Sequence, residues 1–209
     1  EKPKYLSAED AASIPLAGLT AYRACVTKAQ IKPSDNVLIT GAGGGVSQFA
    51  AKIALALGAE VYVTSSSESK IEQSKAFGVT DGFNYSEKSW WKAAIQSAGS
   101  FDKIIDSGGG QSLNDYIKVV SPGGKIVVYG ATGGKVDKFD IHRLFWSQAS
   151  IIGSTMGNDQ EFTDMIAFFE EHKIRPSIDK VLPLEEFESA FARFEDKEQF
   201  GKVVLRIGH

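Results

Sequence analysis

The sequence lacks the features that mark membrane, secreted and metal-cluster proteins. Its 209 residues include one cysteine, Cys25, so the chain can form no internal disulfide and no cysteine cluster for zinc. No apolar run approaches the length that crosses a bilayer, and the net charge of -3 comes without a basic block. We therefore expect no membrane segment and no nucleic-acid partner, and a cytoplasmic location.

The chain also lacks an initiator methionine, because it opens on Glu-Lys-Pro-Lys. We expect that a segment upstream has been removed. Hydrophobic residues make up 43% of the sequence and charged residues 23%, which is enough to build one core with a small annex.

A glycine-rich turn separates an apolar strand from a helix-forming stretch. Residues 36–40 (Asn-Val-Leu-Ile-Thr) lead into the turn, and alanine-rich residues 48–57 follow it. The glycines are Gly41, Gly43, Gly44 and Gly45. They let the backbone approach a ligand closely, while free N–H groups at the start of the helix attract phosphate. The pattern predicts a nucleotide site, preferably for a dinucleotide, although a glycine turn can also be purely structural.

The second strand, residues 60–64, ends without the acidic residue that usually binds the ribose of NAD. Ser65, Ser66 and Lys70 stand there instead. Hydroxyl groups and a positive charge suit a 2′-phosphate, so the pattern favours NADP(H) over NAD(H). The serines are equally suited to cap a helix over residues 68–77, and the two roles are compatible.

Strand and helix signals alternate along the rest of the chain, which is typical of a parallel α/β sheet. Further strands are expected at 81–84, 101–106, 125–129 and 151–153, with helices from Trp90, at 113–120 and at 159–172. Three of the strands end in glycine, at the sheet edge where such folds bind ligands. The predicted fold class is α/β, a doubly wound parallel sheet of the Rossmann type.

Several motifs stand in order across nearly the whole chain. They are Leu-Ala-Gly-Leu-Thr-Ala-Tyr (16–22), the glycine-rich turn, Phe-Asn-Tyr (83–85), Ser-Pro-Gly-Gly (121–124), Ile-Gly-Ser (152–154) and Phe-Gly-Lys-Val-Val (200–204). With them the sequence resembles the medium-chain dehydrogenase/reductase superfamily, in its quinone-oxidoreductase-like and zinc-type alcohol-dehydrogenase-like branch. The resemblance implies an NADP-binding domain over 1–175 with a leading helical segment. Residues 176–209 would form an annex that returns to an N-terminal catalytic domain absent from this chain.

The resemblance also implies a set of coenzyme contacts. The turn through Val46 would hold the pyrophosphate, with Ser47 where many members have glycine. Tyr85 would touch the 2′-phosphate, Thr20 would lie beside the nicotinamide, and Lys202 would lie near the phosphates. Further contacts would come from the strand ends: Ser107, Gly108, Gly130, Ala131, Ile152, Gly153 and Ser154. Plainer roles stay open, such as a Thr20 hydroxyl bonded to its own helical turn and a solvated Lys202.

A metal is not expected. Zinc-dependent members have a cysteine ligand four residues before the position of Thr20, and this sequence has Leu16 there. His142, His172 and His209 are scattered without ligand spacing. The resemblance thus implies a zinc-free, NADPH-dependent enzyme.

No catalytic acid or base is evident, so catalytic residues stay unassigned. Asp102 and Asp106 flank one strand and are interpreted as a strand-start residue and as a turn or ribose contact, while Cys25 is interpreted as a small buried apolar group. Hydride transfer to a quinone or an activated enone needs little acid catalysis, and transfer to an ordinary carbonyl needs more.

Two other classes of protein remain open. An S-adenosylmethionine methyltransferase shares the glycine turn and the Pro-Gly-Gly, but it would need an acid at the end of the second strand. A non-catalytic NADPH-binding protein is the other.

The sequence also predicts self-association and low turnover. Residues 150–154 are expected to form an edge strand with apolar Ile151 and Ile152, which invites a homodimer. A small-molecule substrate would bind between this domain and the absent one, so the chain alone should bind coenzyme with little turnover.

Overall fold

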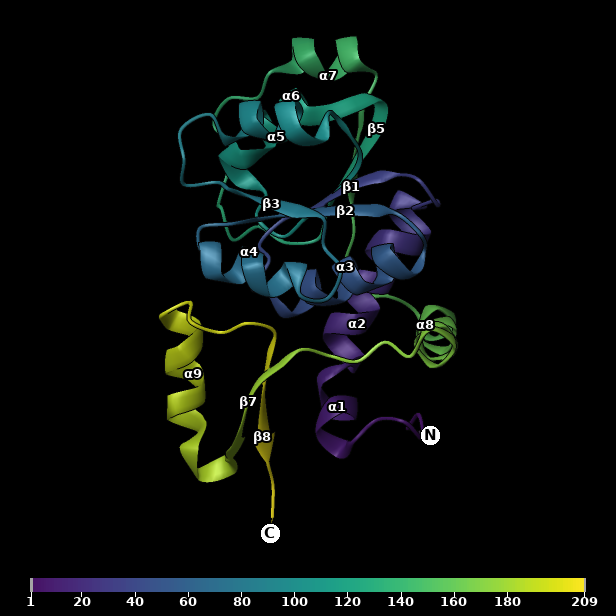
Figure 1. The fold of residues 1–209 in the computed structure, drawn as a ribbon, viewed down its shortest axis with the longest axis vertical. Helices are drawn as coiled ribbons and strands as arrows, with labels where there is room; N and C mark the ends of the chain where they lie inside the picture. Colours follow the sequence, from purple (N-terminus) through teal and green to yellow (C-terminus); the bar gives the residue numbers. More distant parts are fainter. Residues whose placement is uncertain (1, 209) are drawn as a thin grey trace.

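A six-stranded parallel sheet lies at the centre of the computed structural model, which describes residues 2–208 (Figure 1). The strands are β1 (Asn36–Ile39), β2 (Glu60–Ser65), β3 (Asp81–Asn84), β4 (Phe101–Asp106), β5 (Val120–Val128) and β6 (Ser150–Gly153). Their order is β3-β2-β1-β4-β5-β6, and all neighbours pair in parallel. The order reverses between β1 and β4, so the predicted doubly wound fold is confirmed.

Helices cover both faces of the sheet. On one side lie α2 (Pro15–Tyr22), α3 (Gly45–Ala56), α4 (Glu68–Lys75) and α8 (Asp159–His172), and on the other α5 (Trp90–Ala98), α6 (Leu113–Val119) and α7 (Ile141–Ser147) (Figure 1). Successive strand residues point to opposite faces. Val37 and Ile39 therefore join the core under α3, whereas Leu38 joins the core under α5 and α6.

Before the sheet, the chain forms α1 (Ala8–Ser13), α2 and a π-helix, η1 (Arg23–Ala29). The leading helical segment was expected, but its wide π turn was not. Gln30 ends this helix in a left-handed conformation (φ 57°) and donates its N–H to the carbonyl of Cys25. Cys25 is fully buried, and burial raises the pKa of its thiol, in agreement with its interpretation as a small apolar group.

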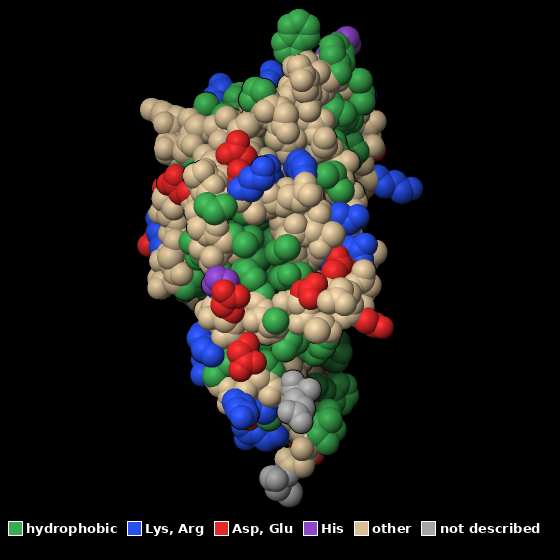
Figure 2. Space-filling model, turned by 90° about the vertical axis from the view of Figure 1, so that its right-hand side faces the viewer, with side chains coloured by type: hydrophobic (Ala, Val, Ile, Leu, Met, Phe, Trp, Pro, Cys, Tyr) green, Lys and Arg blue, Asp and Glu red, His purple; other side chains and the backbone are tan. Residues whose placement is uncertain are grey.

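The structure differs from the sequence prediction around β5 and α7. β5 begins at Val120 and includes the Pro122–Gly124 turn, because Val120 already pairs with Phe101 across a register shift. The helix α7 was not predicted. Its Phe145 and Trp146 are exposed, and hydrophobic side chains gather at this end of the molecule in Figure 2.

A second, separate sheet forms the annex. It contains β7 (Ile178–Pro183), η3 (Leu184–Glu186), α9 (Phe187–Glu195) and β8 (Lys202–Arg206), with β7 and β8 paired in parallel. It lies at the opposite end of the molecule from α7 (Figure 1). The predicted separation of the last strand from the main sheet is thus observed, and its assignment to a missing domain stays a prediction.

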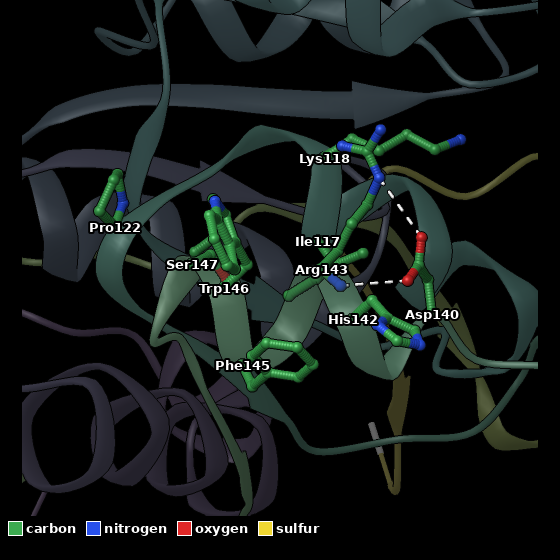
Figure 3. Close-up of a pocket in the computed structure, with 10 residues that line it drawn as sticks. Ile117, Lys118, Pro122, Asp140, His142, Arg143, Phe145, Trp146 and Ser147 are labelled. Carbon is green, nitrogen blue, oxygen red and sulfur yellow. Dashed lines mark hydrogen bonds and ion pairs between the residues drawn. The ribbon is translucent and has the colours of Figure 1, made fainter.

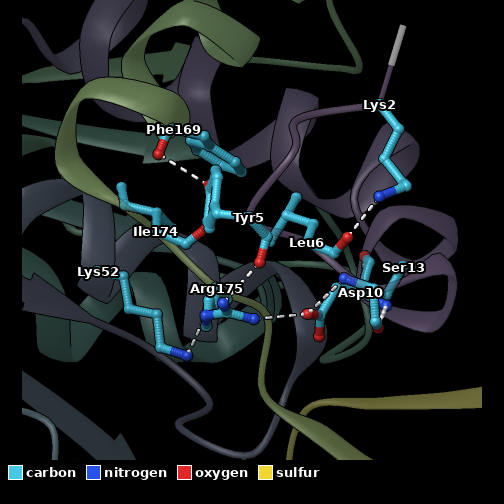
Figure 4. A network of polar contacts seen from close by, with 10 residues as sticks. Lys2, Tyr5, Leu6, Asp10, Ser13, Lys52, Phe169, Ile174 and Arg175 are labelled. Atoms are coloured by element: carbon cyan, nitrogen blue, oxygen red, sulfur yellow. Dashed lines mark hydrogen bonds and ion pairs between the residues drawn. The ribbon is translucent and has the colours of Figure 1, made fainter.

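Polar contacts fix the segment that leaves α8 for the annex (Figure 4). The Tyr5 hydroxyl lies 2.8 Å from the carbonyl oxygen of Phe169 and 2.7 Å from that of Ile174. Arg175 forms an ion pair with Asp10 at 3.0 Å. Lys52, on α3, donates to the Arg175 carbonyl at 2.9 Å, and burial lowers the pKa of Lys52 to about 8.

Within the described residues, no helix is both long and apolar enough to span a bilayer.

Candidate coenzyme site

The glycine-rich turn joins β1 to α3 at the carboxyl edge of the sheet. Gly41 adopts φ +71°, a conformation that side chains rarely take, and its carbonyl accepts from the Gly44 N–H at 2.9 Å. Gly44 is the N-cap of α3 and has no side chain to cap the helix. The first N–H groups of α3 therefore receive no hydrogen bond from an N-cap side chain. An anion bound at a helix start needs such N–H groups.

Two lysines from distant parts of the chain lie against this turn. A Cβ atom on Gly43 would lie 2.7 Å from Cδ of Lys70, and a Cβ on Gly45 would lie 2.6 Å from Cδ of Lys202. Any side chain at these two glycines would displace a lysine. The predicted positions Gly43, Gly45, Lys70 and Lys202 are thus brought together around one turn.

The C-terminal segment runs alongside the same turn. The Gly201 N–H donates to the Gly43 carbonyl at 2.9 Å, and Lys202 donates its N–H to Ser177 at 2.8 Å. Lys70 donates its ammonium to the carbonyl of Lys197, and burial lowers the Lys70 pKa, an effect opposed by Asp179. The annex therefore supplies part of the surface over the phosphate turn.

The end of β2 carries the predicted determinants of coenzyme choice. Ser65 is buried, and its hydroxyl accepts from the Ser67 N–H at 3.1 Å. The N-cap of α4, Ser67, makes no side-chain cap. The helix-capping role considered for the serines at the end of β2 is therefore not observed at the N-cap position, which Ser67 occupies. Tyr85 donates its N–H to the Ser65 carbonyl at 3.1 Å, and its ring is 50% exposed beside the cavity described next.

A cavity of about 280 Å³ lies at the ends of the middle strands. Ligand pockets generally measure about 300–1,000 Å³, so this one suits part of a dinucleotide. It is lined by Thr40, Gly41, Thr64, Tyr85, Ser107, Gly108, Ser112, Tyr116, Thr132, Gly133 and Lys197. Of the predicted residues, Gly41, Tyr85, Ser107 and Gly108 meet there.

Close backbone packing explains the glycines after β4 and β5. A Cβ on Gly130 would lie 2.6 Å from the Ser107 carbonyl oxygen, and one on Gly133 would lie 3.0 Å from the Gly108 oxygen. Gly130 and Ala131 therefore support the cavity wall, and their predicted contact with coenzyme stays a prediction.

The remaining predicted contacts lie away from the cavity. Thr20 donates its hydroxyl to the Leu16 carbonyl at 2.8 Å, the plain role considered for it, and also faces the Met156 sulfur at 3.7 Å. At the end of β6, Ile152 packs against the core while Gly153 is exposed. Ser154 donates its N–H to Val128 at 2.9 Å. Thr20 and the end of β6 thus form a second, separate group.

Sequence reasoning missed Lys197. This residue follows α9 in a left-handed conformation (φ 54°) and lines the same cavity as Tyr85. No local pattern places it there, because it reaches the cavity only through the return of the C-terminal segment. The one sequence feature that could have indicated Lys197 is its position three residues before the Phe-Gly-Lys motif at 200–202.

A larger hollow of about 720 Å³ lies between α6 and α7 (Figure 3). Asp140 accepts from the Arg143 N–H at 3.0 Å and forms an ion pair with its side chain at 3.4 Å. The lining contains none of the strand-end glycines, so the chemistry points to the smaller cavity. In residues 2–208 no three His, Cys, Asp or Glu side chains are grouped to hold a metal, and His209 lies outside this range.

Residues 45–171 match the family described as zinc-binding dehydrogenase. The chain belongs to this family. The match covers more than half of the chain, so the resemblance to medium-chain dehydrogenases and reductases is confirmed. The family is one of oxidoreductases that use nicotinamide coenzymes.

Relatives and solved structures agree with this membership. A zinc-type alcohol dehydrogenase-like protein, YogA, of Leptosphaeria maculans is 34% identical over 98% of this chain and 60% of its own. A crystal structure of an NAD-dependent alcohol dehydrogenase has 39% identity and a TM-score of 0.92, covering 99% of this chain and 61% of that one. The 2-octenoyl-CoA carboxylase reductase CinF, solved with NADP and 2-octenoyl-CoA, has 28% identity and a TM-score of 0.91, covering 98% and 51%. The chain thus spans about half to three fifths of these proteins.

Proposed function

We propose that this chain is the coenzyme-binding part of an NADPH-dependent oxidoreductase. The observation that carries the proposal is the end of β2, where Ser65, Ser66 and Lys70 replace an acidic residue beside the glycine-rich turn. A carboxylate there would repel a 2′-phosphate, whereas hydroxyl and ammonium groups attract it. Lys197, which lines the cavity, adds a second positive charge.

The proposed reaction is two-electron reduction of a quinone, an activated enone or a carbonyl compound. NADPH would supply the hydride, and this chain would bind and orient it through the turn and the strand ends. Support for an enone comes from the CinF structure, whose 2-octenoyl thioester is a conjugated acceptor. That structure holds NADP, but an NAD-dependent relative is also close, so the coenzyme choice rests on the β2 residues.

Fluorescence titration with NADPH, NADH and S-adenosylmethionine tests the proposal. The expected result is NADPH binding at least tenfold tighter than NADH, since a charge-assisted phosphate contact contributes about 1.5–3 kcal/mol. Equal affinity for the two coenzymes would reject the NADP assignment. Binding of S-adenosylmethionine in their place would favour the methyltransferase alternative.

We further propose that the isolated chain turns over little. Support comes from its coverage of only about 60% of its relatives, which leaves room for the second wall of a substrate cleft. NADPH oxidation should be followed at saturating coenzyme with quinones, enones and aldehydes, beside a full-length relative. Turnover within about tenfold of that relative would place the chemistry inside this chain. If a longer form of the protein also bound NADPH without turnover, a non-catalytic NADPH-binding protein would be favoured.

A homodimer through the edge strand β6 is also proposed, together with a cytoplasmic location. β6 pairs on one side only, with β5, and Ile151 on it is 39% exposed. An exposed edge with apolar side chains favours pairing with a second strand. The helix that precedes β6 in the chain, α7, carries Trp146, which is 84% exposed.

A further inference from the structure

A fully buried carboxylate lies at the end of β4, next to the cavity. Asp106 Oδ1 accepts from the Thr40 hydroxyl at 2.7 Å and from the Gly108 N–H at 3.1 Å, and Oδ2 accepts from the Gly109 N–H at 2.6 Å. Hydrogen bonds to an ionised acceptor are among the stronger ones in proteins. Because its oxygens are occupied and enclosed, Asp106 is poorly placed to contact a ligand itself.

The loop that Asp106 holds has an unusual shape. Gly109 and Gly110 adopt φ values of +57° and +60°. The loop presses against the one after β5: Gly133 donates its N–H to the Gly108 carbonyl at 2.7 Å, and a Cβ on Gly110 would lie 2.3 Å from the Gly133 oxygen. Glycine adopts many backbone conformations, so its own preferences do not fix the shape of this loop, and the carboxylate supplies two hydrogen bonds that do.

The same carboxylate reaches the first strand. Thr40, which follows β1, donates its hydroxyl to Asp106 and accepts from the Ser107 N–H at 3.1 Å. Thr40, Ser107 and Gly108 all line the cavity, and the Ser107 hydroxyl lies 3.1 Å from where a Cβ on Gly41 would be. One side chain therefore connects the β1 end, the β4 end and, through Gly108, the loop after β5.

We propose that Asp106 is a positioning residue for the coenzyme, which sets the wall of the nucleotide cavity without touching the ligand. The proposal rests on the coenzyme-binding function proposed above. Its physical content is preorganisation: the loop is held in its binding shape before the ligand arrives, so binding does not have to order it. Tyr116 lines the same cavity, and burial raises the pKa of its hydroxyl, which the nearby negative charge of Asp106 raises further.

The test combines coenzyme affinity with hydrogen exchange on the 209-residue chain. Asp106→Ala should raise the NADPH dissociation constant on the order of 10- to 100-fold, the range known for residues that orient the ligands of a metal ion. Thr40→Val, which keeps shape but removes the hydroxyl, should raise it by a smaller factor, and Thr40→Ser should restore most of the affinity. In the ligand-free variants, amides of residues 107–110 should exchange faster while β1 and β4 stay protected.

Asp102→Asn is the matched control, because Asp102 stands at the other end of β4 and accepts the Asn36 N–H at 2.9 Å. It should change melting temperature without changing NADPH affinity. If Asp106 has only a structural role, the variants should melt at lower temperatures with unchanged NADPH affinity and unchanged hydrogen exchange at residues 107–110. That result would overturn this inference but leave the proposed coenzyme-binding function in place. A wild-type chain that binds neither NADPH nor NADH would overturn the proposed function and the inference with it. If Asp106→Ala does not fold, equal affinities of the Thr40→Val and Thr40→Ser variants would decide against the inference.

Discussion

The six-stranded unit and the annex bury their apolar residues very differently. In the sheet unit, Phe101, Ile104 and Ile126 have no exposed surface. In the annex, the aromatic residues of α9 stay open, with Phe191 64% exposed and Phe187 47% exposed. Apart from α7, whose Trp146 is 84% exposed, the sheet unit encloses its apolar residues, whereas α9 presents an apolar side that no described residue covers fully. Most of the fully buried side chains therefore belong to the sheet unit.

The annex is nevertheless tied to the coenzyme turn. Gln48, buried on α3, donates its amide to the Ala42 carbonyl and accepts from the Ser177 hydroxyl at 2.9 Å. Ser177 begins the path into β7. The annex thus meets the glycine-rich turn through a few polar contacts, while most of the buried apolar residues lie in the sheet unit.

The largest expected effect is a loss of stability, which should differ between a buried and an exposed phenylalanine. Phe101→Ala removes a fully buried ring and should lower the free energy of unfolding by about 3–5 kcal/mol, whereas Phe191→Ala removes an exposed ring and should change it by less than about 0.5 kcal/mol. Urea denaturation followed by circular dichroism measures both. Comparable losses at the two positions would mean that α9 is already covered within this chain.

A second pair separates the lysines at the glycine turn. Lys70→Ala should narrow the preference for NADPH over NADH about tenfold, because it removes the proposed 2′-phosphate partner, and Tyr85→Phe should narrow it less. Lys202→Ala, in the annex, should weaken the binding of NADPH and NADH equally, because Lys202 lies against Gly45 in the turn proposed to bind the pyrophosphate. Calorimetric titration gives the NADPH and NADH dissociation constants of each protein. Lys75→Ala is the control, since Lys75 on the same helix pairs with Asp81 at 2.8 Å. An unchanged ratio in Lys70→Ala would remove this lysine from coenzyme selection.

Two substitutions test whether a dimer forms through the β6 edge of the sheet unit or through α9 of the annex. Ile151→Lys on the β6 edge should convert a dimer to monomer, while Phe191→Lys on α9 should leave it intact, because the proposed interface belongs to the sheet unit. Ile151 is the better target than Ile152, whose side chain packs into the core. Light scattering reports the mass. Dissociation by Phe191→Lys alone would move the interface to the annex, and a monomeric wild type at high concentration would remove it.

The last prediction concerns the pH dependence of stability that Lys52 produces at the junction of the two regions. Its pKa is lowered from 10.5 to about 8 by burial, with Asp10 opposing the shift. Below pH 8 the folded chain carries the cost of a buried charge, and between pH 8 and 10.5 it loses the proton before the unfolded chain does. Relative to Lys52→Met, the wild-type free energy of unfolding should therefore rise with pH over this window, by at most about 1.4 kcal/mol per pH unit. Denaturation at several pH values measures it, and parallel curves for the two proteins would refute the shift.

Local pattern predicted the sheet unit well, for identifiable reasons. The glycine turn after β1 and the apolar runs of β2 and β4 are each specified by residues adjacent in sequence, and period and turn chemistry suffice to place them. The start of β5 at Val120 was missed because its pairing with Phe101 continues across a Pro-Gly-Gly turn, a tertiary effect.

The rest of the site depends on contacts between distant segments. Lys197 reaches the cavity because the chain returns after α9, and Asp106 acquires its role from Thr40, 66 residues earlier. The π-helix over residues 23–29 was not predicted. Of these features, only the contact of Asp106 with the turn at Gly108 and Gly109 is indicated by neighbouring residues.

A crystal structure of the chain with bound NADP⁺ would show where the coenzyme phosphates lie. We expect the pyrophosphate at the start of α3, over Gly43, Gly44 and Gly45, and the 2′-phosphate within hydrogen-bond distance of Ser66 and Lys70. A pyrophosphate bound elsewhere, or a 2′-phosphate facing solvent with Lys70 still bonded to the Lys197 carbonyl, would contradict this expectation.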